Sequence, residues 1–301
     1  MIDNPIPWPG GARCAVAMTW DMDADSGLNY YHPDRADRLV ASQSLTRYGP
    51  LIAMPRIVKM SQRFNLHQTF FVPGWCAEQY PEAVELILKN DHELALHGYL
   101  HERPNELSDT DEQYWLERGI AAFVNRFGLR PRGWRAPSFA FSKYSLRYLI
   151  DRGFDYDSSL MGDDIPYLLQ DASGALLELP TQWTLDDWPY YMHNRDFNYM
   201  MPISAPQRAL EVYRSEFDAA WTYGGLWISV WHPFLSGRPA RLAAIIDLLE
   251  YMQSKGNVWF ARLDEICDYV KKLVADIAWQ PRVEHLPPYH SPLPELPRRH
   301  G

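Results

Sequence analysis

Cysteine is scarce in this chain, which has only Cys14, Cys76 and Cys267 among its 301 residues. Their odd number, wide spacing and apolar neighbours argue against a disulfide framework and favour buried free thiols. None of them belongs to a Cys-x-x-Cys pair. A zinc site built on cysteine is therefore not expected.

An excess of positive charge is also lacking. Lys and Arg total 29 against 38 Asp and Glu, which gives a formal net charge of -9. Nucleic acids and anionic membrane surfaces attract basic patches, so we expect neither as a partner. Residues 1–9 lack the basic leader and apolar stretch of a signal peptide, and no run reaches the length of a membrane span. We therefore expect a cytoplasmic protein.

Short apolar runs alternate with longer amphipathic stretches, a pattern typical of parallel strands joined by crossover helices. No glycine-rich phosphate loop follows the first run, which disfavours a dinucleotide or nucleoside triphosphate site. We expect strands at 14–20, 67–73, 93–97, 132–135, 154–157, 176–179, 226–231 and 257–261. We expect helices at 52–64, 80–90, 109–127, 143–152, 206–221, 239–254 and 262–275. Seven or eight such units in one chain favour an α/β barrel over an open doubly wound sheet.

Two segments interrupt this regular pattern. Residues 24–50 form a long connection after the first strand, and such connections are often lids, binding loops or oligomer contacts. Residues 276–301 contain six prolines and are expected to be an extended tail. We therefore predict one barrel domain over 1–275 and a proline-rich tail over 276–301.

Polar residues cluster where the predicted strands end. Asp21 and Asp23 close the first strand, and His97 with His101 follow the third. If the segment turns helically after the strand, the two imidazoles share a face and can bind one metal ion; the alternative is two unrelated surface histidines. Asp21 and Asp23 point to the same side of a strand, so their carboxylates repel each other. A divalent cation bound to one and a cationic side chain paired with the other would relieve this repulsion.

Two more strand ends complete this constellation. Arg135 follows the fourth strand and is a candidate partner for one of the two aspartates, while His232 follows the strand at 226–231. Two histidines and one carboxylate leave coordination positions open, as in catalytic metal sites, where bound water reaches a pKa of about 7. His232 is the candidate general acid, because its ordinary pKa of about 6.5 suits proton transfer.

These segments resemble the polysaccharide deacetylases with NodB homology, also called carbohydrate esterase family 4. The resemblance runs from about residue 12 to 270 and is carried, in the family's order, by TWDMD at 19–23, HGYLH at 97–101, RAP at 135–137 and SVWH at 229–232. It implies an irregular (β/α)7 TIM-like barrel. It also implies that Asp23, His97 and His101 bind the metal, Asp21 is the base, Arg135 orients it and His232 is the acid. Zinc is the metal it implies first, with cobalt, nickel, manganese or iron as alternatives.

The sequence departs from the common family pattern at three places. Met22 separates the two aspartates, which leaves open which of them binds the metal; we expect Asp23. Ser138 replaces the aromatic residue after the RAP proline, so its backbone N–H is a candidate oxyanion donor. The segments 157–164 and 179–188 resemble a branch with soluble peptidoglycan-deacetylase-like proteins, cyclic imide hydrolases and cofactor-independent allantoinases. From these segments we take Asp164, Trp183 and Asp187 as candidate substrate-binding residues, with Tyr167 and Trp188 nearby.

The resemblance implies a hydrolase of non-peptide carbon–nitrogen bonds. A mouth narrowed by residues 24–50 suits a small amide, cyclic imide or ureide. The alternatives are N-deacetylation of acetylated sugars, peptidoglycan or chitooligosaccharides, and a catalytically silent barrel that only binds a ligand. Relatives in the branch form homo-oligomers, so we expect a tetramer or dimer.

Overall fold

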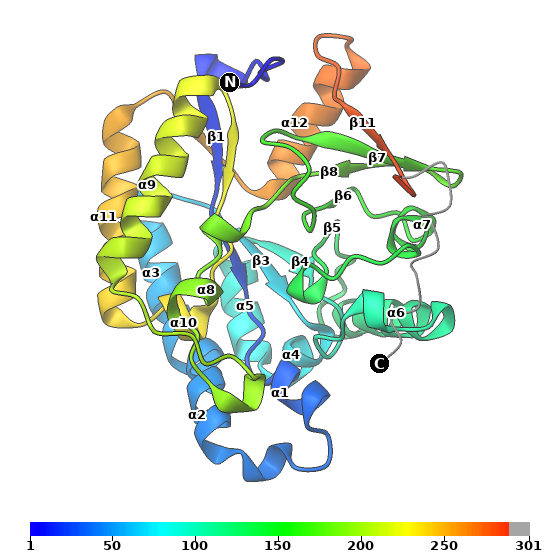
Figure 1. Cartoon of the computed structure of the whole chain (residues 1–301), viewed down its shortest axis with the longest axis vertical. Helices are drawn as coiled ribbons and strands as arrows, with labels where there is room; N and C mark the ends of the chain where they lie inside the picture. Colours follow the sequence, from blue (N-terminus) through cyan, green and yellow to red (C-terminus); the bar gives the residue numbers. More distant parts are fainter. Residues whose placement is uncertain (289–301) are drawn as a thin grey trace, which may run out of the picture.

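Parallel strands enclosed by helices form a barrel in the computed structural model, which describes residues 1–288 (Figure 1). The first strand breaks at Met18 into β1 (Cys14–Ala17) and β2 (Thr19–Asp21), which belong to two different sheets. Bridges from Trp20 to Trp231 and from Asp186 to Val230 join the two sheets. The predicted α/β barrel is confirmed.

The strands follow one another around the barrel nearly in chain order. In one sheet β1 lies between β9 (Leu226–Ile228) and β10 (Val258–Phe260), parallel to both. The other sheet has the order β2, β3 (Thr69–Val72), β4 (Glu93–Leu96), β5 (Gly133–Trp134), β6 (Tyr156–Asp157), β8 (Gly174–Glu178), β7 (Tyr167–Asp171), β11 (Val283–His285). Within residues 1–288, β7 and β8 are the one antiparallel strand pair. The parallel strands therefore end at one common mouth.

The predicted strands are present because both of their faces are buried. Every residue of β1, β2, β3 and β4 is buried, as the nearly continuous apolar runs of a parallel sheet require. The helices that cover them are α3 (Met54–Phe64), α5 (Pro81–Lys89), α6 (Asp109–Phe127), α7 (Ser145–Asp151), α9 (Pro206–Tyr223), α11 (Pro239–Lys255) and α12 (Leu263–Ala275). All seven predicted helices are confirmed.

Local capping signals place several helix starts. Ser108 precedes α6, and its hydroxyl accepts a hydrogen bond from the Asp111 backbone N–H. Pro81 and Pro239 occupy the first turns of α5 and α11, where a missing N–H costs no helical hydrogen bond. The residues at these positions therefore determine where the three helices begin.

The two irregular segments contain more structure than expected. The 24–50 connection folds into α1 (Ser26–Tyr31) and α2 (Val40–Tyr48), which lie with α4 (Gly74–Gln79), α8 (Trp188–Tyr191) and α10 (Pro233–Ser236) in the lower half of Figure 1. The predicted tail includes β11, which pairs with β7, while residues 289–301 of that tail lie outside the described residues. The prediction of a long connection thus did not include these two helices, while the described part of the tail contains an extended strand that packs on the sheet.

Candidate active site

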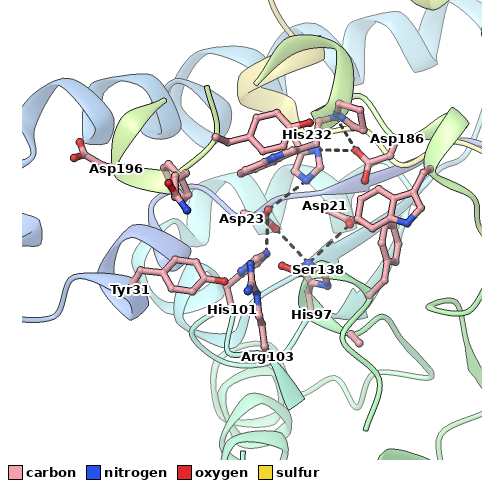
Figure 2. A pocket seen from close by; sticks show the side chains of 18 of the residues that line it. Asp21, Asp23, Tyr31, His97, His101, Arg103, Ser138, Asp186, Asp196 and His232 are labelled. Carbon is pink, nitrogen blue, oxygen red and sulfur yellow. Dashed lines mark hydrogen bonds and ion pairs between the residues drawn. The ribbon is translucent and has the colours of Figure 1, made fainter. Parts of the chain in front are cut away.

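A cavity of about 720 Å³ opens at the mouth of the barrel. Acidic and imidazole side chains form its base, and aromatic rings form much of its wall (Figure 2). Its lining includes Asp21, Asp23, Tyr31, His32, His97, His101, Arg103, Ser138, Phe139, Trp183, Asp186, Trp188, Asp196, Phe197, Tyr199 and His232. The structure therefore brings together residues from nearly every part of the barrel.

Asp23, His97 and His101 converge at the base of this cavity. The Nε2 atoms of His97 and His101 lie 3.4 Å from Oδ1 and Oδ2 of Asp23, respectively (Figure 2). Within residues 1–288, Asp23 Oδ1 is buried and accepts no hydrogen bond. Buried oxygens normally have partners, and two imidazoles with one carboxylate are a ligand set that zinc accepts. These three residues thus fit a divalent cation.

The geometry of His97 is set from outside the cavity. His97 follows β4, and its Nδ1 lies 2.9 Å from the backbone carbonyl of Arg135. Donation of the Nδ1 proton to that carbonyl leaves Nε2 with a free lone pair toward Asp23, the arrangement found behind metal-bound histidines.

His101 reaches the site from a loop and not from a helix. Gly98 and His101 have positive φ values of 67° and 63°, and the Glu102 carboxylate accepts the Tyr99 and Leu100 N–H groups at 2.9 and 2.7 Å. A Cβ on Gly98 would lie 2.6 Å from Glu102 Oε1. A tight loop that needs glycine therefore replaces the helical turn suggested by the spacing of the two histidines.

The burial and charge of Asp23 favour its ionised form. Burial alone would raise the pKa of Asp23, but the neighbouring His101, His232 and His97 lower it below its usual value. An ionised carboxylate between imidazoles is the state in which it can bind a cation.

Asp21 occupies a different environment beside the cluster. Its Oδ1 accepts a hydrogen bond of 2.7 Å from Arg135 Nη1, while its Oδ2 lies 3.8 Å from His97 Nε2. Arg135 is fully buried, donates to the Ser158 carbonyl and hydroxyl, and lies 4.0 Å above the Phe71 ring. The predicted Asp21–Arg135 pair is thus present and held rigidly.

His232 forms a dyad with Asp187. The Nδ1 of His232 lies 2.6 Å from Asp187 Oδ1, and Asp187 Oδ2 also accepts the His232 backbone N–H at 3.0 Å and the Ser236 hydroxyl. Burial lowers the pKa of His232, but the charge and hydrogen bond of Asp187 raise it to about 10. The His232 Nε2 faces the cavity, 3.4 Å from Asp23 Oδ2.

Asp187 therefore does not occupy the position expected of a substrate-binding residue. It is fully buried behind His232 and is not part of the cavity wall. Its neighbour Asp186 lines the cavity instead, and burial raises the pKa of Asp186 to about 7 against the opposing charge of His232. Two adjacent aspartates in a loop give no periodicity that would predict which one faces the substrate.

The other candidate substrate residues fall into two groups. Ser138 and Trp183 line the cavity, Ser138 with a positive φ of 56° and Trp183 with its ring edge-on to Phe139 at 4.8 Å. Asp164 lies elsewhere, where its carbonyl accepts the Leu226 N–H at the start of β9. Tyr167 is also absent from the cavity wall, because it is buried in the core. The structure thus does not bring Asp164 and Tyr167 to the site.

Sequence reasoning missed several residues of the wall, among them Tyr31, Arg103 and Asp196. Tyr31 comes from α1, Arg103 follows His101 by two positions, and Asp196 comes from the turn η7 (Arg195–Phe197). The unusual length of the 24–50 connection pointed toward Tyr31, and the position of Arg103 beside a candidate ligand was a signal that was not used. Asp196 gave no sequence signal, because it approaches the site only through tertiary contacts.

Comparison with known proteins identifies the family. A Mycobacterium smegmatis protein of solved structure, described as a polysaccharide deacetylase, is 38% identical over 98% of this chain and 99% of its own, with a TM-score of 0.88. The chain belongs to the polysaccharide deacetylase family. The family model "Polysaccharide deacetylase" matches residues 48–156, and a Helicobacter pylori peptidoglycan deacetylase is 27% identical over 84% of this chain and 94% of that protein.

Structural likeness extends to another enzyme of this fold. The structure of Puue allantoinase shares 24% identity over 95% of this chain and 96% of its own, with a TM-score of 0.79. The resemblance to the deacetylase family and the barrel it implied are confirmed. The chain is a hydrolase of carbon–nitrogen bonds outside peptides, and Asp23, His97 and His101 form a candidate metal site in it. Among residues 1–288, none of the helices has the length and apolar character needed to cross a membrane.

Proposed function

We propose that this family member is a zinc hydrolase of small amides, with cyclic imides and ureides as its substrate classes. The observation that supports this proposal is that the 24–50 segment covers one side of the cavity. The Ser42 hydroxyl of α2 donates to Asp196 at 2.6 Å, and His32 Nε2 lies 2.6 Å from the Asp196 carbonyl. These contacts join the 24–50 segment to η7 beside the metal ligands, which favours a compact substrate.

Asp23, His97 and His101 would hold the cation. Nitrogen and oxygen ligands with open positions suit zinc. When bound, the cation supplies Lewis acidity, which polarises the scissile carbonyl and makes water a better nucleophile.

Asp21 and His232 divide the proton transfers between them. Asp21 Oδ2 accepts the proton of the attacking water as its oxygen bonds to the carbonyl carbon, while Arg135 holds Oδ1. His232 donates a proton from Nε2 to the nitrogen as the carbon–nitrogen bond breaks, and Asp187 stabilises the imidazolium beforehand. The products are a carboxylic acid, which ionises in water, and an amine or amide.

A hydrolysis assay with zinc supplied tests this proposal. We expect turnover of at least one of succinimide, hydantoin and allantoin, and loss of turnover in chelator that added zinc restores. Turnover of N-acetylglucosamine oligomers alone would favour the second candidate, a sugar N-deacetylase. Trp183 supports that candidate, because its ring is 51% exposed at the cavity and could stack on a sugar face.

We also propose a cytoplasmic homo-oligomer. Three buried free cysteines suit a reducing compartment. Large apolar side chains are exposed on two segments that Ser42 and Asn194 connect through a hydrogen bond. These side chains are Val40, Leu51, Ile52, Met200, Met201 and Ile203. Sedimentation velocity measures the oligomeric state, and a monomer would contradict this assignment.

A further inference from the structure

Tyr31 and Arg103 form a polar wall of the cavity that the proposed proton transfers do not use. Figure 2 shows the Tyr31 hydroxyl directed toward the Arg103 side chain, close to His101. The Arg103 guanidinium carbon lies 5.3 Å from the centre of the Tyr31 ring. One residue comes from α1 and the other from the loop after β4, so the fold brings them together from distant parts of the chain.

Both side chains carry buried polar groups without partners. Among residues 1–288, neither the Tyr31 hydroxyl nor Arg103 Nε makes a hydrogen bond of good geometry, although both atoms are buried and Arg103 and Ser138 lie close to Tyr31. Arg103 uses Nη1 for an exposed ion pair of 3.1 Å with Glu106, which leaves Nε free. Exposed pairs of this kind contribute little, whereas a buried unpaired donor is costly. Two such groups side by side indicate a site for an acceptor that the protein itself does not supply.

The surroundings keep Tyr31 in its neutral, donating form. Burial raises the pKa of Tyr31, although Arg103 and Ser138 act in the opposite direction. A smaller hollow lined by Asp23, His101, Tyr31, Arg103 and Ser138 connects this wall to the metal ligands. A molecule with one oxygen at the cation can therefore extend a second oxygen toward Arg103 and Tyr31.

We propose that Arg103 and Tyr31 form a subsite for a second oxygen acceptor of the substrate, a carbonyl or a carboxylate next to the amide that is cleaved. The inference rests on the proposed function, because it assigns the chemistry of the same cavity. Imides and ureides carry such a second carbonyl, and many small acylated acids carry a carboxylate. An isolated acetamide group has neither, so this subsite would select against it.

Calorimetric binding to the zinc-loaded protein tests the subsite without turnover. Acetate can occupy the cation alone, whereas malonate, succinate or glutarate adds a second carboxylate. We expect at least one dicarboxylate to bind at least tenfold more tightly than acetate. Arg103→Met should remove most of this advantage, and Tyr31→Phe part of it, because each loses a donor to the second acceptor. Succinamide replaces the carboxylates with neutral carbonyls and shows which acceptor is preferred.

Arg147→Met is a matched control. Arg147 also lies over a tyrosine ring, Tyr148, at 4.7 Å, pairs with Asp109 and is 42% exposed against 40% for Arg103, but it does not line the cavity. Arg147→Met should leave the affinities for acetate and for the dicarboxylates unchanged. The subsite is refuted if no dicarboxylate or succinamide outbinds acetate, or if Arg103→Met weakens acetate and dicarboxylate equally. A protein that passes this binding test yet hydrolyses no amide would instead contradict the proposed function.

Discussion

At the scale of single residues, the two aspartates of the first strand have separate environments. Asp23 faces three imidazoles and has a buried oxygen without a hydrogen bond within residues 1–288, whereas Asp21 is paired with the fully buried Arg135. Met22 had left open which carboxylate is better placed for the metal, and this difference bears on that choice. The geometry supports Asp23 as ligand and Asp21 as base.

Matched substitutions separate these two roles. Asp23→Asn should reduce bound zinc well below one ion per chain, because a neutral amide is a poor ligand for it. Asp21→Asn should keep the metal and lower kcat by about 10²–10⁴-fold, since it removes only the base. Elemental analysis of both purified variants, together with their turnover, shows whether metal binding and base catalysis are lost separately. Equal loss of metal in both would show that Asp21 is also a ligand.

At the scale of secondary structure elements, His92 connects the start of β4 to α3. Its Nδ1 accepts the Gln68 backbone N–H at 3.2 Å, and its Nε2 lies 3.2 Å from the Ser61 hydroxyl. An Nδ1 that accepts a hydrogen bond cannot carry a proton, so the folded state requires the neutral ring. Burial, with the charges of His67 and Arg262, lowers the pKa of His92 to about 4.

The stability contributed by His92 should therefore fall in acid. The pKa is about 6.5 in the unfolded chain and about 4 in the folded one, so the unfolded state binds more protons between these values. As pH falls from 6.5 to 4, the wild type should lose on the order of 3 kcal/mol relative to His92→Gln. Urea unfolding of both proteins across this range measures the difference. His193→Gln, which replaces an exposed histidine that does not contribute to the pKa of His92, is the control, and a pH-independent difference would contradict the prediction.

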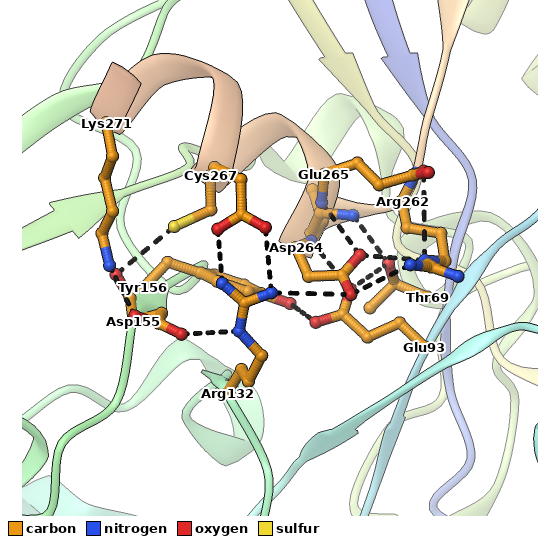
Figure 3. Close-up of polar contacts among 12 residues, drawn as sticks. Thr69, Glu93, Arg132, Asp155, Tyr156, Arg262, Asp264, Glu265, Cys267 and Lys271 are labelled. Atoms are coloured by element: carbon orange, nitrogen blue, oxygen red, sulfur yellow. Dashed lines mark hydrogen bonds and ion pairs between the residues drawn. The ribbon is translucent and has the colours of Figure 1, made fainter. Parts of the chain in front are cut away.

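At the scale of the whole molecule, a buried carboxylate holds distant elements together at the end of the barrel away from the mouth. Glu93 accepts hydrogen bonds from the hydroxyls of Thr69 and Tyr156, each at 2.8 Å, and from the Asp264 backbone N–H at 3.0 Å (Figure 3). These donors belong to β3, β6 and α12. The Tyr156 ring reaches Glu93 over Gly133, where a Cβ would lie 2.0 Å from the ring.

Replacement of this carboxylate should weaken the whole barrel. Glu93→Gln turns one acceptor oxygen into a donor that faces other donors, and we expect a loss of about 1–3 kcal/mol in the free energy of unfolding. Bound zinc should be unchanged, because Glu93 is remote from the mouth. Urea unfolding with metal analysis checks both expectations, with the exposed Glu265→Gln as control. A variant as stable as the wild type would show that these hydrogen bonds contribute no net stability.

Much of the fold could be predicted because it depends on local patterns. In an α/β protein, an apolar run such as 69–72 is stable as a buried strand, and an amphipathic stretch such as 109–127 is stable as a covering helix. Ser108 caps the start of that helix. The strand β7 was missed, since its residues gain burial only by pairing with β8 and β11. The helices α1 and α2 were also missed, because α2 is anchored by Ser42 to residues about 150 positions away in the chain.

The sequence by itself determined the chemistry of the site. Asp21, Asp23, His97, Arg135 and His232 stand at or just after the ends of parallel strands, and such strands direct their ends to one mouth, whereas His101 follows in the loop after β4. Only the tertiary structure decided how their neighbours are used: Asp187 supports His232, Asp186 lines the cavity, Asp164 lies elsewhere, and Tyr31 meets Arg103. The reason is physical, because strand periodicity fixes where a strand-end side chain points, whereas the direction of a loop side chain depends on contacts from remote parts of the chain.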